Sequence, residues 1–373
     1  MITQTIKKAG LAAVLAGTFL ASNTLFAQKE LTVDMSETIA PIQPTMYGIF
    51  FEDINFAADG GLYAEMIKNR SFEFTIPMMG WSQPNSDRHS YNNESGYALP
   101  VKYFEGEGNL NFLRVQVKNA KGYELHNEGF RGMGIKEGDT YRFTFDAKQM
   151  EGAVSAVKAE LLDEKGNTIA EASIPVSGSE WTNYKAEIVP NKTVMKGSLK
   201  LTFEGNGELG LDMISLFPTD TWNGRENGLR KDLVQLLYDL DPGFLRFPGG
   251  CIVEGRTLAR RYQWKKTVGP VDERPSLVNR WNTEFDHRLT PDYYQSFGLG
   301  FFEYFQLSED LGAEPLPILS CGIACQFNTG ELVPMDELDP YVQDALDLIE
   351  FANGSTDTPW GKVRADMGHP EPF

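Results

Sequence analysis

Two short apolar runs of this chain each end abruptly in residues that can carry chemistry, and this arrangement restricts the fold more than any other feature. Residues 47–51 are almost continuously apolar, and Glu52 and Asp53 follow them directly. Residues 244–247 form the second run, which continues into Pro-Gly-Gly-Cys at residues 248–251. Such runs are typical of strands in a parallel sheet that is covered on both faces. Because barrel enzymes keep their chemistry at the carboxyl ends of these strands, we expect a site at this edge.

The segment after residue 218 alternates helices with strands. Leucines at helical spacing predict a helix over residues 229–240, and helices are also expected over residues 299–311 and 339–354. Strands are expected at residues 244–247 and 315–321, after the first and second helices. The residues expected to face inward in the first and third helices are Leu229, Leu233, Leu236, Leu237, Leu240, Val342, Ala345, Leu346 and Ile349.

A period of two replaces this pattern between residues 75 and 217. Apolar and polar side chains alternate over residues 141–148 and again over residues 199–204. Turn residues at 137–139, 164–167 and 204–207 separate the runs. The segment therefore predicts an antiparallel β-sandwich, inserted after the first strand of the parallel sheet. Its aromatic residues Trp181 and Tyr184 either form a platform for stacking sugars or belong to the core.

The order of strands and helices is that of βα units, so the fold class is α/β. Three strands are predicted, whereas a closed (β/α)8 TIM barrel requires eight. The segment is either a small open sheet or an incomplete barrel, and the loop at residues 368–373 favours the incomplete barrel because it leads toward further structure.

Charge and cysteine content limit the partners. The formal net charge of −18 opposes binding to nucleic acid or to anionic membranes. Residues 1–27 are typical of a secretory signal peptide, with Lys7 and Lys8 before a short apolar stretch, so export to the periplasm or beyond is expected. Three cysteines in 373 residues do not make a disulfide scaffold.

No metal site or cofactor is expected. The four histidines are scattered along the chain, and Cys321 and Cys325 have no neighbouring histidine or further cysteine. We expect these two cysteines to be free thiols rather than a disulfide.

Several separate motifs, in order, closely resemble the α-L-arabinofuranosidases of glycoside hydrolase family 51. They are Tyr-Gly-Ile-Phe-Phe-Glu-Asp-Ile-Asn at 47–55, Gly-Gly-Leu-Tyr-Ala-Glu at 60–65, Asn-Arg-Ser-Phe-Glu at 69–73, Leu-Arg-Phe-Pro-Gly-Gly-Cys at 245–251, and Trp264 with Val-Gly-Pro-Val at 268–271. The resemblance covers the chain from about residue 31 to residue 373.

This resemblance implies a TIM barrel and an inserted jelly roll of the carbohydrate-binding-module type. It also implies a retaining mechanism, in which an acid/base and a nucleophile carboxyl group lie about 5 to 5.5 Å apart. In the family these residues end the fourth and seventh strands, the first of them within Gly-Asn-Glu. Neither motif occurs before Phe373, so no catalytic residue is assigned. The expected parts are a signal peptide (1–27), an amino-terminal strand with the first barrel strand (28–74), the sandwich (75–217) and the continuing, truncated barrel (218–373).

Three residues are expected to contact substrate. The resemblance gives Glu52 the role of accepting hydrogen bonds from the arabinofuranosyl hydroxyls, against the alternative of a surface turn acid. Cys251 matches a position that lines the subsite beside the nucleophile, against the alternative of a buried structural thiol. Trp281 is either an apolar floor for the sugar or loop packing. The acids Glu254, Glu284 and Asp286 either line the rim of the cleft or belong to a solvated loop, and we favour the solvated loop.

The resulting hypothesis is an exported, exo-acting α-L-arabinofuranosidase that acts on arabinoxylan or arabinan, of which these residues are an inactive amino-terminal part. An oligomer is compatible with the full-length enzyme. One alternative is an endo-acting glucanase or xylanase of the same family. Another is a non-catalytic fragment whose sandwich binds glycan.

Overall fold

The computed structural model describes residues 32, 34, 36, 40–83, 94–102, 108–119, 122–282 and 292–373. Within these ranges, the helices are all too short or too polar to cross a lipid bilayer. The chain divides into two compact units, Met1–Gln43 and Pro44–Phe373, and the elements below belong to the second. The expected signal peptide lies outside the described residues.

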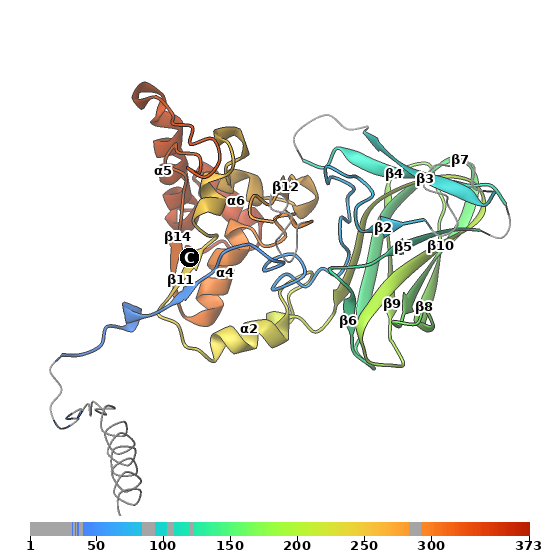
Figure 1. The fold of residues 1–373 in the computed structure, drawn as a ribbon, viewed down its shortest axis with the longest axis horizontal. Coiled ribbons are helices and arrows are strands. Elements are labelled where there is room, and N and C mark those ends of the chain that lie inside the picture. Colours follow the sequence, from blue (N-terminus) through green and yellow to red (C-terminus); the bar gives the residue numbers. More distant parts are fainter. Residues whose placement is uncertain are drawn as a thin grey trace, which may run out of the picture. The chain divides into compact units, whose positions relative to one another are not determined.

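An antiparallel sheet of nine described strands fills the middle of the sequence (Figure 1). Its strands are β2 (Trp81–Ser82), β3 (Gly96–Lys102), β4 (Asn111–Val117), β5 (Tyr123–Asn127), β6 (Met133–Ile135), β7 (Tyr141–Leu162), β8 (Thr168–Pro175), β9 (Thr182–Ile188) and β10 (Val194–Pro218). The long strands β7 and β10 pair with each other over most of their lengths. The other edge of β10 pairs in turn with β6, β5 and β4, and the other edge of β7 pairs with β9 and β8. These two strands therefore organise the whole sheet.

A bulge interrupts the long pair near its middle. The register shifts between Glu204 and Gly205, and Gly205 has a φ of +116°. A Cβ atom at this position would lie 2.4 Å from the carbonyl oxygen of Ala153 on the facing strand, so the site requires glycine. The expected turn over residues 204–207 is therefore wrong, because this glycine makes a bulge within β10 and the strand continues.

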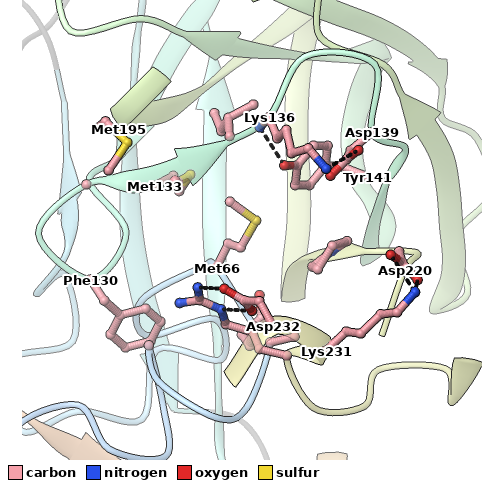
Figure 2. A pocket seen from close by; sticks show the side chains of 18 of the residues that line it. Met66, Phe130, Met133, Lys136, Asp139, Tyr141, Met195, Asp220, Lys231 and Asp232 are labelled. Carbon is pink, nitrogen blue, oxygen red and sulfur yellow. Dashed lines mark hydrogen bonds and ion pairs between the residues drawn. The ribbon is translucent and has the colours of Figure 1, made fainter. Parts of the chain in front are cut away.

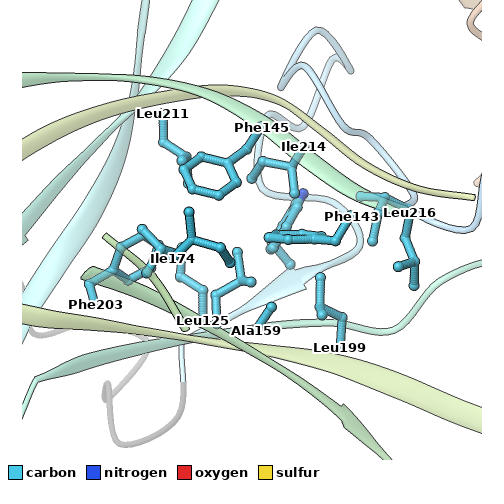
Figure 3. Packing of buried hydrophobic residues seen from close by; sticks show 14 of the residues in the cluster. Leu125, Phe143, Phe145, Ala159, Ile174, Leu199, Phe203, Leu211, Ile214 and Leu216 are labelled. Atoms are coloured by element: carbon cyan, nitrogen blue, oxygen red, sulfur yellow. The ribbon is translucent and has the colours of Figure 1, made fainter. Parts of the chain in front are cut away.

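The apolar side chains of the sheet gather in one core (Figure 3). Phe143, Phe145 and Leu211 come from one half of the sheet and face Leu125 and Leu199 from the other half. The alternation expected over residues 141–148 and 199–204 is confirmed, since the apolar members are buried and the polar members point outward. The bent long strands thus let one sheet enclose its own core.

Three parallel strands form a second sheet, in the order β1 (Ile49–Phe50), β11 (Phe244–Phe247) and β14 (Glu314–Pro317). Ile49 lies beside Leu245, and Leu245 lies beside Pro315. The expected parallel arrangement of these strands is confirmed. A further pair, β12 (Leu277–Val278) with β13 (Tyr294–Gln295), closes the base of the loop between them.

The first and third parallel strands are shorter and more exposed than the sequence predicts. Phe50 in β1 is 54% exposed, and Leu316 in β14 is 45% exposed, so neither strand is covered on both faces. β14 ends at Pro317 instead of continuing to residue 321. Of the three, β11 fits the expectation best, with Leu245 and Phe247 fully buried.

The described helices are α2 (Lys231–Tyr238), α3 (Cys251–Glu254), α4 (Phe301–Leu311), α5 (Asp339–Asn353) and α6 (Pro359–Asp366). Short 3-10 turns occupy η1 (Pro44–Met46), η2 (Trp222–Gly224), η3 (Leu258–Arg260), η4 (Trp264–Thr267), η5 (Val271–Glu273) and η6 (Met335–Glu337). The expected apolar side of α4 is confirmed, since Phe301, Phe302, Phe305 and Leu311 are all buried. Phe247 of β11 stacks on Tyr304 of this helix at 4.7 Å between ring centroids, which joins strand and helix in an aromatic core.

The inward face expected around α2 is confirmed in part, because Leu229 is buried and Leu233 and Leu237 pack against the core. The inward face expected for α5 is wrong. α2 also buries Val234, whereas Leu236 within the helix and Leu240 just beyond its end are 62% and 57% exposed. α5 buries Leu348, Phe351 and Ala352, whereas Val342, Leu346 and Ile349 lie on its exposed side. Both helices are apolar on two sides, and the period of the sequence does not determine which side packs.

Candidate functional site

Glu52 lies at the carboxyl edge of the parallel sheet, as expected. The strand pairing continues past β1, because the backbone N–H of Phe51 donates to the carbonyl of Arg246 at 2.8 Å and that of Asp53 to the carbonyl of Pro248 at 3.0 Å. Glu52 is therefore held between two fixed peptide groups. Its side chain packs directly over Gly249, where a Cβ atom would come within 2.7 Å of the Glu52 Cγ.

Trp281 reaches the same edge from the loop after β12. Its indole Nε1 donates a hydrogen bond to the Glu52 carboxylate at 3.1 Å. The guanidinium of Arg280 lies over the indole ring, 4.2 Å from its centroid. The structure thus brings two of the three expected substrate residues into direct contact.

Buried amides fasten this loop to the end of β1. Asn279 is fully buried, donates to the Asp53 carbonyl at 2.6 Å and accepts the backbone N–H of Trp281 at 3.0 Å. Asn282, also fully buried, accepts the backbone N–H of Asn55 at 3.0 Å. Sequence reasoning missed both asparagines, because a short Asn-Arg-Trp-Asn segment has no spacing that reveals its tertiary partners.

Asp53, directly after Glu52, is a buried polar centre. Its carboxylate accepts hydrogen bonds from the Tyr293 hydroxyl, from Gln295 Nε2 at 2.9 Å and from the Ala58 backbone N–H at 3.2 Å. Burial, reinforced by the nearby charge of Asp59, raises the pKa of Asp53 to about 7. Asp53 therefore supports the strand end from beneath, whereas Glu52 is half-buried beside Trp281.

Cys251 begins α3, two residues beyond Gly249. Its thiol is half-buried and lies beside Cys325 and Glu254. The hydrogen bond that joins Glu52 to Trp281 does not involve this thiol. Burial, followed by the neighbouring Cys325 thiol, raises the pKa of Cys251 to about 11. All three cysteines of the chain lie in the described ranges and are free thiols, as expected for Cys321 and Cys325.

Of the three acids expected in a solvated loop, only Glu254 lies within the described residues. Glu254 ends α3, and its Oε2 atom is buried, so the expectation of a solvated loop is wrong for this residue. Burial follows because α3 turns immediately after β11 and directs this side chain toward Cys251. Glu284 and Asp286 lie outside the described residues.

The aromatic residues considered as a sugar platform on the antiparallel sheet pack against other side chains. Tyr184 stacks on Phe145 at 5.4 Å and donates its hydroxyl to the carbonyl of Ser177. Trp181 meets Phe112 edge-on at 5.5 Å, and the Nζ of Lys148 lies 5.0 Å from its ring centroid. Tyr184 packs against the core of the sheet, which favours the core alternative for this residue. Trp181 is half-buried and belongs to neither core cluster, so both alternatives stay open for it.

A cavity of about 690 Å³ lies away from this edge, between the segment around Tyr63, strand β6 and the start of α2 (Figure 2). None of the three expected substrate residues lines it. Arg230 pairs there with Asp232 at 3.0 Å, and Lys231 pairs with Asp220 at 2.8 Å. Because these charges compensate one another, the cavity offers no convergent charge for a ligand, and we keep the candidate site at Glu52.

Comparisons with known proteins bear on this edge. Residues 236–373 match the family described as "Alpha-L-arabinofuranosidase 1 domain". Over 365 residues the chain is 40% identical to an "Extracellular exo-alpha-L-arabinofuranosidase" of Streptomyces chartreusis, covering 92% of this chain and 40% of the relative. The structure of the arabinose-bound MgGH51 α-L-arabinofuranosidase matches with a TM-score of 0.79 at 29% identity, covering 91% of this chain and 53% of that one. The chain therefore resembles the α-L-arabinofuranosidases of glycoside hydrolase family 51.

The resemblance expected from the motifs is therefore confirmed. The chain is also 37% identical over 358 residues to "Alpha-L-arabinofuranosidase 2" of Arabidopsis thaliana, covering 92% of this chain and 50% of the relative. The chain thus spans about half the length, or less, of these curated relatives.

Proposed function

We propose that this chain is the amino-terminal part of an exo-acting, retaining α-L-arabinofuranosidase that removes terminal α-L-arabinofuranosyl groups from arabinan or arabinoxylan. The observation that carries the proposal is the Glu52–Trp281 pair at the carboxyl edge of the parallel strands. Its support is the 40% identity to a relative named as an exo-α-L-arabinofuranosidase, and the match to a structure that holds arabinose.

The proposed architecture is the start of a TIM barrel, with β1, β11 and β14 as its first three strands. The nine-stranded antiparallel sheet is then a jelly-roll insertion after the first barrel strand, over residues 75–217. The parallel pairing of the three strands and the alternation of strands with helices along the chain, β11, α4, β14 and α5, support this assignment. Residues 28–74 and 218–373 would be the barrel segments on either side of the insertion.

Each expected site residue has a proposed role. The Glu52 carboxylate, oriented by the indole of Trp281, accepts hydrogen bonds from sugar hydroxyls. The indole face away from Arg280 packs beneath the sugar ring. Cys251 lines the neighbouring subsite from the start of α3.

The acid/base and the nucleophile are proposed to lie in the part of the relatives that this chain does not span. General acid catalysis and nucleophilic attack both require those carboxylates, so residues 1–373 alone would bind but not hydrolyse the glycoside. Export, directed by residues 1–27, would bring the enzyme to plant polysaccharide outside the cell, and the name of the Streptomyces relative supports this location.

The test is ligand binding by the 373-residue chain. Saturation-transfer NMR with methyl α-L-arabinofuranoside should give ring-proton signals that are lost in Glu52→Gln, and methyl α-D-xylopyranoside should give none. An aryl α-L-arabinofuranoside should not be hydrolysed. Circular dichroism of both proteins controls for folding.

Two results would overturn the proposal. The absence of a saturation-transfer signal from methyl α-L-arabinofuranoside with the folded chain would show that Glu52 does not bind the sugar. Clear hydrolysis by the chain would show that its catalytic carboxylates lie within residues 1–373. Shortening of a glucan without release of arabinose, by a protein extended to the length of its relatives, would instead favour the endo-acting alternative.

A further inference from the structure

A cluster of three potential metal ligands lies at the start of α3. The Sγ atoms of Cys251 and Cys325 and a carboxylate oxygen of Glu254 all lie within 4.8 Å of one another. Cys251 and Cys325 are far apart in the sequence, so the fold, and not a local motif, assembles this set.

The backbone fixes each member in place. Cys251 and Glu254 are three residues apart on the single turn of α3, which puts both side chains on one face. The backbone N–H of Cys325 donates to the carbonyl of Gly255, directly after that turn, at 3.1 Å. The carbonyl of Cys325 in turn accepts the backbone N–H of Asn328 at 2.9 Å, so the loop that carries the second thiol is itself folded tightly.

One carboxylate oxygen of Glu254 lacks a partner. Oε2 of Glu254 is buried and has no hydrogen-bond donor among the described residues. A buried carboxylate oxygen without a donor is destabilising, and a bound cation would satisfy it. Cys325 is fully buried, whereas Cys251 and Glu254 are half-buried, so the cluster has a protected side and an accessible side.

The chemistry of the donors selects the ion. Two thiolates and one carboxylate suit Zn²⁺, which takes sulfur and oxygen ligands in tetrahedral geometry. Ca²⁺ and Mg²⁺ require oxygen ligands and would not use the thiols. Three protein ligands leave one position for water, on the accessible side. Together with Zn²⁺, these ligands carry one net negative charge, and the nearby guanidinium of Arg280 provides the balancing positive charge.

We propose that Cys251, Glu254 and Cys325 form a Zn²⁺ site, at which the thiols give their protons to solvent as the two Zn–S bonds form. The sequence expectation of no metal site considered Cys321 with Cys325, and it missed that the fold places Cys325 beside Cys251 instead. The proposal gives Cys251 a role as a metal ligand in addition to the subsite role proposed above, whereas Glu254 and Cys325 have no proposed role in sugar binding. Its test involves no sugar, so its failure and the failure of the proposed function can be told apart.

The test uses the 373-residue chain without a histidine tag, in a phosphine reductant that keeps the thiols reduced. Calorimetric titration should give one Zn²⁺ per chain, with Ca²⁺ and Mg²⁺ giving no heat. Co²⁺ should give a near-ultraviolet thiolate-to-metal absorption band, which Zn²⁺ abolishes. Cys251→Ser, Cys325→Ser and Glu254→Gln should each weaken Zn²⁺ binding by more than about tenfold.

Cys321→Ser is the matched control, because this exposed thiol lies four residues from Cys325 and outside the cluster. It should leave both affinity and the cobalt band unchanged. The proposal is overturned if reduced, folded protein gives no cobalt–thiolate band, or if Cys321→Ser weakens binding as much as Cys325→Ser does. If a cysteine variant unfolds, Glu254→Gln still decides the question, since it keeps the size of the side chain and removes only the charged ligand.

Discussion

The indole Nε1 of Trp281 donates a hydrogen bond to the Glu52 carboxylate at 3.1 Å, although 229 residues separate the two in the chain. This bond occupies one oxygen of the carboxylate and fixes its plane. In the proposed site, the second oxygen accepts a hydrogen bond from a sugar hydroxyl, and the carboxylate loses little further rotational freedom when it does so. A preorganised acceptor of this kind improves affinity because less entropy is lost on binding.

Replacing Trp281 tests that preorganisation. Trp281→Phe keeps an aromatic ring but removes the N–H donor, so arabinofuranoside affinity should fall by about three- to tenfold, as for loss of one ordinary hydrogen bond. An NMR titration with methyl α-L-arabinofuranoside measures the change. Trp181→Phe, in the antiparallel sheet, is the matched control and should bind as the parent does. Equal affinity in all three proteins would contradict the role of the indole.

Gly249 and Gly250 offer a comparison between neighbours. A Cβ atom at Gly249 would lie 2.7 Å from the Glu52 Cγ, and its φ is +149°, whereas a Cβ atom at Gly250 meets nothing within 4 Å. Gly249→Ala should therefore displace Glu52 and weaken arabinofuranoside binding by about tenfold or more, while Gly250→Ala should not. Thermal unfolding of both variants separates local displacement from general destabilisation. Similar binding by the two variants would show that Glu52 does not depend on this contact.

The sequence was a good guide where local patterns and tertiary packing agree. The alternation at Tyr141, Phe143 and Phe145 reports burial directly, because every second residue of a strand shares a face. The position of Glu52 was equally predictable, since a carboxylate after an apolar strand must lie at the sheet edge. The prediction of the buried side of α4 was correct because only one side of this helix is strongly apolar.

Long-range pairing could not be predicted in the same way. The bond between Trp281 and Glu52 and the approach of Cys325 to Cys251 depend on how loops fold over the sheet, and no periodicity encodes that. Gly205 shows the converse difficulty, because a glycine between polar residues is compatible with a turn or a bulge. The packing of its strand against β7 decides between them.

Asp53 should make stability depend on pH. Its pKa is about 7 in the folded chain, against an ordinary value of 3.8, so the folded state binds more protons than the unfolded state between these values. The associated stabilisation is complete below about pH 3.8, decreases as the pH rises and is lost above about pH 7. Asp53→Asn removes the titrating group. As the pH rises from about 4 to about 7, the free energy of unfolding of the variant should therefore increase relative to that of the parent, by at most ~1.4 kcal/mol per pH unit.

Denaturant unfolding at several pH values between about 4 and 8 measures this difference. Asp212 in β10 is a useful comparison, because burial raises its pKa to about 8 at a separate place. The stability difference between Asp212→Asn and the parent should therefore continue to grow up to about pH 8, whereas the difference for Asp53→Asn should level off near pH 7. Parallel profiles for the parent and Asp53→Asn would show that the Asp53 carboxyl is not perturbed as described.

Breaking the buried ion pair between Glu65 and Arg70 should strongly lower the free energy of unfolding. Its N–O distance is 3.3 Å, and the two side chains are only 2% and 8% exposed. Glu65 also accepts the backbone N–H groups of Ile67 at 2.9 Å and Leu216 at 3.0 Å, so it joins the loop after β1 to the end of β10. Glu65→Ala leaves a buried guanidinium unpaired and should lower the free energy of unfolding by about 3–5 kcal/mol.

The exposed pair Lys362–Asp366 provides the control, because its side chains are 65% and 64% exposed at an N–O distance of 2.6 Å. Asp366→Ala should cost less than about 1 kcal/mol, since solvent screens the charges. Replacing Glu65 and Arg70 together by methionine should cost less than the sum of the single replacements, because no buried charge is then left alone. Additive losses, measured by urea unfolding, would mean that the two side chains stabilise the fold independently rather than as a pair.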